Sequence, residues 1–135
     1  MCIDCDSGMA RDFDESIRAM MDAFGQAVRT FPELAGISTD ERQLRRTLLH
    51  EEYNEYTVAE AEGDLVEIAD ALADMTVIIF GTANAYGIDL PAVLGEVMRS
   101  NMSKVNPKTG KVDRREDGKI LKGDNYLPPM IEDYM

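Results

Sequence analysis

Two acidic segments decide the fold expected for this chain: Glu51-Glu52-Tyr53-Asn54-Glu55 and Glu67-Ile68-Ala69-Asp70, with Asp74 one helical turn further on. On a helix, residues three and four apart share a side, so the acids of each segment gather on one side. The first segment continues an apolar stripe that begins at Leu44, and the second lies in an almost wholly apolar run over 65–80. We therefore expect two helices that turn carboxylates toward the core, the second of them buried nearly all round.

Carboxylates in such a setting need a positive counter-charge, because they repel one another and are costly to dehydrate. Arg45 and Arg46 are too few to neutralise six acids. Mg2+, or Mn2+ in its place, prefers oxygen ligands and is the counter-ion that we expect. The apolar surroundings favour this metal site over an ordinary solvated acidic face. For Asp74 two interpretations are equally favoured: a residue that supports the metal ligands, or an ordinary acid on the helix surface.

Capping and turn signals predict four helices. Asp12 with Glu15 is a capping pair for the first helix, which carries Met and Phe at helical spacing. Ser38 with Glu41 opens a helix over 39–62, Gly63 separates it from a helix over 64–86 that stops at Gly87, and Asp89 with Pro91 starts the last helix. Antiparallel packing across the short turn would bring the two acidic segments face to face.

The first helix supplies a second candidate surface. Met20, Met21 and Phe24 belong to its apolar face, and such a stripe is most often plain core. The sharper interpretation is that one or more of the three also lines a pocket for a nucleobase.

The charge of the chain is uneven. Residues 1–98 carry 6 basic and 20 acidic groups, net −14, whereas 99–122 carries 8 basic and 3 acidic groups, net +5. An acidic helical body joined to a basic tail suggests that the body binds metal and the tail binds phosphate. The tail is rich in turn formers, with 111–113 and 119–121 able to pair as a small hairpin, and after Pro128-Pro129 we expect an end that is poorly ordered alone or docked on a partner.

Composition narrows the class of protein. With 135 residues and a net charge of −12, the chain fits a single domain, core helices over 11–103 and a basic tail over 104–135, and does not fit a nucleic-acid binder. It has no signal peptide and no bilayer-spanning apolar run, so we expect a cytoplasmic protein without a membrane partner, in the host cytoplasm if it is phage-encoded. Cys2 and Cys5 fit reduced thiols better than a zinc or redox pair.

Clustered carboxylates without histidine fit metal-assisted attack of water on a phosphoanhydride. A carboxylate that does not bind the metal can take the proton of the water. A di-iron centre would require Glu-x-x-His on two helices, and the single histidine, His50, precedes its acidic cluster. Nor does His50 sit in an arrangement that would serve a serine or cysteine hydrolase, and the chain has no phosphate-cradling glycine loop.

Taken together, these residues resemble a known family. Glu51-Glu52-x-x-Glu55 followed by Glu67-x-x-Asp70 is similar to the signature of the all-α nucleoside triphosphate pyrophosphohydrolases, the MazG-like and phosphoribosyl-ATP pyrophosphohydrolase-like group. Ser100-Asn101-Met102-Ser103-Lys104 and the lysines and Tyr126 of the tail resemble its stand-alone bacterial and phage type. The resemblance implies an all-α, four-helix MazG-like bundle completed by dimerisation, as a homodimer or a dimer of dimers, with a short irregular or hairpin tail.

The resemblance also implies roles for individual residues. Metal ligands would be Glu52, Glu55, Glu67 and Asp70, and Glu51 would orient or deprotonate water, with an exchange of roles between Glu51 and Glu52 possible. Phosphate or sugar would be bound by Asn101 and Lys104, and the triphosphate would be covered by Lys119, Lys122 and Tyr126. Met20-Met21 stands where many relatives carry a Phe-His pair, which leaves base recognition open.

The implied reaction is Mg2+-dependent hydrolysis of a nucleoside triphosphate substrate to the monophosphate and pyrophosphate. Deoxynucleotides, namely dGTP, dUTP or dCTP, are favoured for a small stand-alone member, although no residue selects among them. Two alternatives stay open: a phosphoribosyl-ATP pyrophosphohydrolase, and a non-catalytic helical interaction protein that keeps its acids for metal-stabilised folding.

Overall fold

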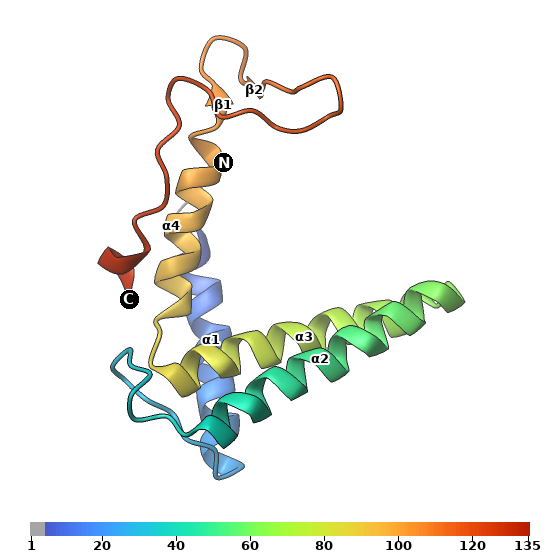
Figure 1. Cartoon of the computed structure of the whole chain (residues 1–135), viewed down its shortest axis with the longest axis vertical. Helices are drawn as coiled ribbons and strands as arrows, with labels where there is room; N and C mark the ends of the chain where they lie inside the picture. Colours follow the sequence, from blue (N-terminus) through green and yellow to red (C-terminus); the bar gives the residue numbers. More distant parts are fainter. Residues whose placement is uncertain (1–4) are drawn as a thin grey trace. The chain divides into compact units, whose positions relative to one another are not determined.

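A computed structural model describes residues 5–135, and Cys2 lies outside the described residues. The regular elements of the described chain are helices apart from one small hairpin, which confirms the predicted all-α class (Figure 1). Its elements are α1 Cys5–Ala23, α2 Thr39–Glu62, α3 Leu65–Tyr86, α4 Leu90–Met102, β1 Val105–Asn106, β2 Lys111–Val112 and the 3-10 helix η1 Ile131–Tyr134. No described helix is both long and apolar enough to cross a bilayer.

The described chain forms two compact units. One consists of Phe13–Ile88 and contains most of α1 together with α2 and α3. The other joins the described residues up to Asp12 to Asp89–Met135, so that α4 groups with the tail.

The ends of α2 and α3 follow the predicted local signals. The hydroxyl of Ser38 accepts a hydrogen bond from the backbone N–H of Glu41 at the start of α2. At the start of α3, the carboxylate of Asp64 accepts a hydrogen bond from the backbone N–H of Glu67. Gly63 and Gly87 end the two helices in the left-handed conformation, which glycine adopts without strain. The predicted bounds of α2 and α3 are therefore confirmed within one residue.

The start of α1 was predicted wrongly. The helix begins at Cys5, so Asp12 and Glu15 lie inside it and do not cap it. An acid pair at this spacing is equally compatible with a helix interior, which is why the sequence signal misplaced the boundary.

α2 and α3 lie side by side and antiparallel, joined by the turn at Gly63 (Figure 1). Arg45 is buried between them, where its Nε donates to the hydroxyl of Thr82 and its NH2 donates to the carbonyl of Ile78. Gly81 leaves room for this guanidinium, because a Cβ there would lie 2.5 Å from its NH2 atom. These contacts fix how far α3 is shifted along α2.

The expectation that α3 is buried nearly all round is wrong for the single chain. Leu65 is 77% exposed, Leu72 49% and Ile79 43%. α2 covers the face of α3 that carries Ala71 and Gly81, and leaves these side chains outside that face. Of the six acids expected to face the core, Glu52 and Asp74 are half-buried. The other four are exposed in the single chain: Glu51, Glu55, Glu67 and Asp70.

The tail folds differently from the prediction. β2 pairs antiparallel with β1, with Val105 opposite Val112, and the predicted pairing of 111–113 with 119–121 is reduced to a bridge between Arg114 and Ile120 and one bond from Leu121 N–H to the Asp113 carbonyl. Nor is the end after Pro128-Pro129 loose, because it packs on α4 and forms η1. The docking of η1 on α4 depends on contacts between residues far apart in the chain, which local turn signals do not encode. β1 and β2, by contrast, are joined directly by the turn at 107–110.

Candidate active site

Three carboxylates from two helices converge in the α2–α3 pair. Glu52 and Glu55 are one turn apart on α2, and Asp74 faces them from α3. One oxygen of each lies within 4.8 Å of the others, close enough for the three to share a cation. Asp74, for which the sequence left the role balanced, thus lies directly beside two predicted metal ligands.

The electrostatics of this acidic triad (Glu52, Glu55, Asp74) show that its charge is poorly compensated. Burial raises the pKa of Glu52 to about 7, helped by a hydrogen bond with Glu55 and by the negative charges of Glu55, Asp74 and Asp70. Burial also raises the pKa of Asp74, with Asp70 and Glu55 adding to the shift. The Oε2 atom of Glu52 is buried without a hydrogen-bond partner among the described residues. An all-oxygen set with an unused buried acceptor fits a hard divalent cation.

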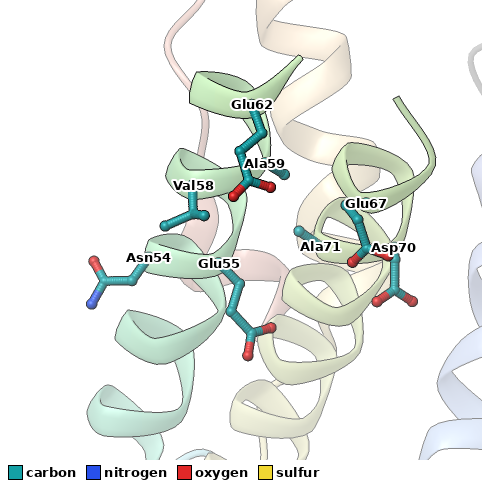
Figure 2. A pocket seen from close by; sticks show the side chains of 8 residues that line it. All are labelled: Asn54, Glu55, Val58, Ala59, Glu62, Glu67, Asp70 and Ala71. Carbon is teal, nitrogen blue, oxygen red and sulfur yellow. The ribbon is translucent and has the colours of Figure 1, made fainter. Parts of the chain in front are cut away.

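Two further predicted ligands line a cavity that adjoins the triad. Its volume is about 500 Å³, and Glu55 on α2 faces Glu67 and Asp70 on α3 across it (Figure 2). Its full lining is Asn54, Glu55, Val58, Ala59, Glu62, Glu67, Asp70 and Ala71. Glu62 was missed by the sequence reasoning, although it is two turns from Glu55 on the same face of α2.

Other sequence candidates lie apart from this cavity. Glu51 is exposed on α2 and belongs neither to the acidic triad nor to the cavity lining. Met21 is buried to 1% exposure, and its sulfur would lie 3.6 Å from a Cβ at position 81, so it packs in the core. Met20 is half-buried and Phe24 is exposed. The structure does not gather Met20, Met21 and Phe24, which directly follows α1, around a described pocket.

The predicted phosphate-binding residues converge in the other unit. Lys104 Nζ donates to Asn101 Oδ1 at 3.3 Å and lies 6.0 Å from the centre of the Tyr126 ring. Lys122 Nζ lies 4.9 Å from the same ring centre. Lys119 sits in the turn closed by Asp117, which accepts its backbone N–H. We call Asn101, Lys104, Lys122 and Tyr126 the lysine–tyrosine cluster.

The fold and the two sites define a class: an all-α protein with paired carboxylate helices and a separate basic cluster. Residues 17–101 match the family model described as phosphoribosyl-ATP pyrophosphohydrolase. The match covers more than half of the chain, which therefore belongs to this family and to the MazG-like all-α NTP pyrophosphohydrolase superfamily. The family depends on divalent metal and hydrolyses a pyrophosphate bond of a nucleotide. A comparison with curated proteins gives no significant match.

Proposed function

We propose that this chain hydrolyses a nucleoside or deoxynucleoside triphosphate between the α and β phosphates, with Mg2+ as cofactor. The observation that carries the proposal is the convergence of Glu52, Glu55 and Asp74 from two helices in a member of a pyrophosphohydrolase family. Carboxylates that raise one another's pKa repel each other when ionised, and a bound divalent cation would remove that repulsion as the protons leave.

The metal would be held by Glu52 and Glu55, with Asp74 beside them and with Glu67 and Asp70 across the adjoining cavity. When bound, it supplies screening of phosphate charge and a more acidic water. Glu51 is the proposed proton acceptor, since a carboxylate outside the metal ligands stays basic. Attack of water breaks the phosphoanhydride bond, and pyrophosphate leaves.

The lysine–tyrosine cluster is the proposed binding place for polyphosphate. Two ammonium groups near one tyrosine ring repel each other, and an anion between them removes that repulsion. The amide of Asn101 adds a hydrogen-bonding group for phosphate or sugar. Lys119, exposed in its turn, is proposed to cover the same ligand.

We propose a homodimer as the working assembly, with α3 in the interface. Leu65, Leu72 and Ile79 are exposed at spacings of seven residues, and this spacing places them along one stripe of the helix. Covering such a stripe with a second copy would remove apolar surface from water.

A second candidate substrate is phosphoribosyl-ATP, favoured by the description of the matching family. One panel separates the candidates: phosphoribosyl-ATP, the four common ribonucleoside triphosphates, and deoxynucleotides including dGTP, dUTP and dCTP, each with Mg2+ or Mn2+. We expect a monophosphate product with equimolar pyrophosphate, and no turnover in chelator. A chain that turns over none of them, yet melts at lower temperature in chelator, would instead be a metal-stabilised interaction protein.

A further inference from the structure

One face of α4 grips the C-terminal segment of the chain. Arg99, Ser100 and Ser103 lie three, four and seven residues after Glu96, positions that share one side of a helix, and Ser103 is the C-cap residue of α4. We call these four residues the C-terminal clasp. Their contacts with residues 127–130 lie within the unit that contains α4.

The centre of the clasp is an ion pair between a buried carboxylate, Glu96, and a half-buried guanidinium, Arg99. Glu96 is 3% exposed, and its Oε1 and Oε2 accept from Nε and NH2 of Arg99 at 2.7 and 2.8 Å. Oε2 also accepts the backbone N–H of Met130 at 2.6 Å. These bonds lower the pKa of Glu96 to about 2, so it is charged at neutral pH.

The clasp uses every backbone N–H that the segment 127–130 offers. Pro128 and Pro129 have none, the N–H of Leu127 donates to Ser103 Oγ at 2.9 Å, and the N–H of Met130 donates to Glu96. The carbonyl of Leu127 accepts from Ser100 Oγ at 2.9 Å. Arg99 adds a bond to the carbonyl of Pro128 at 3.2 Å. A stiff Pro-Pro segment is thus tied to α4 at both ends.

The C-terminal clasp and the lysine–tyrosine cluster are adjacent in the chain. Ser103 immediately precedes Lys104, and Leu127 immediately follows Tyr126, so the Ser103–Leu127 bond lies next to the Lys104–Tyr126 contact. The backbone N–H of Tyr126 donates to the carbonyl of Gly123, closing the turn that follows Lys122. The position of the Tyr126 ring between the two lysines therefore depends on the attachment of 127–130 to α4.

We propose that the C-terminal clasp is a positioning device for anion binding: it holds Tyr126 so that Lys104 and Lys122 face one polyphosphate ligand. This inference rests on the proposed function only in naming the ligand as a polyphosphate. Glu96 and Ser103 are positioning residues, since they act on the ligand through Tyr126 and Lys104.

The test is titration of inorganic triphosphate into the full chain by calorimetry, in excess chelator so that no divalent metal contributes. Glu96→Gln keeps the size of the side chain and removes its charge, and we expect affinity to fall about tenfold. Ser103→Ala removes a separate bond of the clasp and should weaken binding in the same direction by a smaller factor. Glu132→Gln makes the same chemical change at an exposed position of η1 and should leave affinity within about twofold.

Two additional measurements separate positioning from loss of fold. Amide exchange in the peptide spanning 123–135 should become faster in Glu96→Gln, whereas exchange in the peptides of α2 and α3 should stay unchanged. In nucleotide turnover with Mg2+, KM should rise while kcat stays within about twofold, because the chemistry takes place at the acids.

The proposal is overturned if the wild type does not bind triphosphate in chelator, if both clasp variants bind it as tightly as the wild type, or if kcat falls with KM unchanged. An absence of nucleotide turnover in the wild type would remove the proposed function alone. The triphosphate titration would still decide the role of the clasp.

Discussion

Glu52 on α2 and Asp74 on α3 present carboxylate oxygens within 4.8 Å of each other, although they are far apart in sequence and on different helices. Both have a raised pKa, and burial is the leading cause for each. Two acids held together in this way weaken the α2–α3 pair unless a cation joins them. Metal binding should therefore stabilise the same contact that builds the site.

Substitutions can rank the candidate metal ligands. In a calorimetric titration with Mn2+, Glu52→Gln and Asp74→Asn should each weaken binding by about tenfold or more, since each removes a charged oxygen ligand. Glu67→Gln, across the cavity, should have a smaller effect. Glu60→Gln is the matched control, because Glu60 is on α2 but accepts from the Tyr56 hydroxyl at 2.7 Å. A stronger loss in Glu67→Gln than in Asp74→Asn would shift the centre of the site into the cavity.

The stability of the metal-free chain should depend on pH through Glu52. The pKa of Glu52 is about 7 in the folded chain against an ordinary value of 4.5, so between these pH values the folded state binds more protons than the unfolded state. The free energy of unfolding in chelator should consequently decrease as pH rises from about 5 to about 8. Thermal unfolding of the wild type and Glu52→Gln, each measured at both pH values, checks this. Equal pH dependence of the two proteins would show that Glu52 is not the responsible group.

Two glycines that end helices should respond differently to alanine. Both have positive φ, +66° at Gly63 and +75° at Gly87, but a Cβ meets nothing within 4 Å at Gly63 and would lie 2.0 Å from the Phe31 carbonyl oxygen at Gly87. Gly63→Ala should lower the free energy of unfolding by about 1 kcal/mol from backbone strain alone. Gly87→Ala should lower it by more than about 3 kcal/mol, because the 24–38 connection must also move. Urea unfolding measures both, and equal losses would contradict this packing of Phe31.

The proposed dimer can be tested at the exposed stripe of α3. Leu72→Glu places a charge in the proposed interface and should convert the dimer to a monomer in sedimentation analysis. Ile120→Glu is the matched control, since Ile120 is 42% exposed in the tail and Leu72 is 49% exposed. A wild type that sediments as a monomer, or a Leu72→Glu variant that stays dimeric, would refute the interface.

Local signals explain which parts of the fold could be predicted. Ser38, Gly63 and Gly87 act on their own helix ends, and the sequence predicted α2 and α3 within one residue. The first turns of α1 carry no comparable signal. The β1–β2 hairpin closes over the turn at 107–110, but the tail carries several turn formers at close spacing, and these alone do not specify which turn joins the paired strands.

The sequence predicted that the candidate site lies on a pair of acidic helices, but it did not predict which carboxylates of the two helices come together. Helical spacing placed Glu52 with Glu55 on one side of α2. That Asp74 joins them follows from the shift of α3 along α2, which the buried Arg45 and the gap at Gly81 fix through long-range contacts. Glu96 gave no signal, since its function requires the chain to return to α4.

The most direct test of the metal centre is the anomalous difference density of a crystal grown with Mn2+. We predict a peak between α2 and α3 at bonding distance, about 2 Å, from carboxylate oxygens of Glu52 and Glu55, with Asp74 adjoining it. The account is contradicted if these side chains turn toward bulk solvent and no peak lies between the two helices.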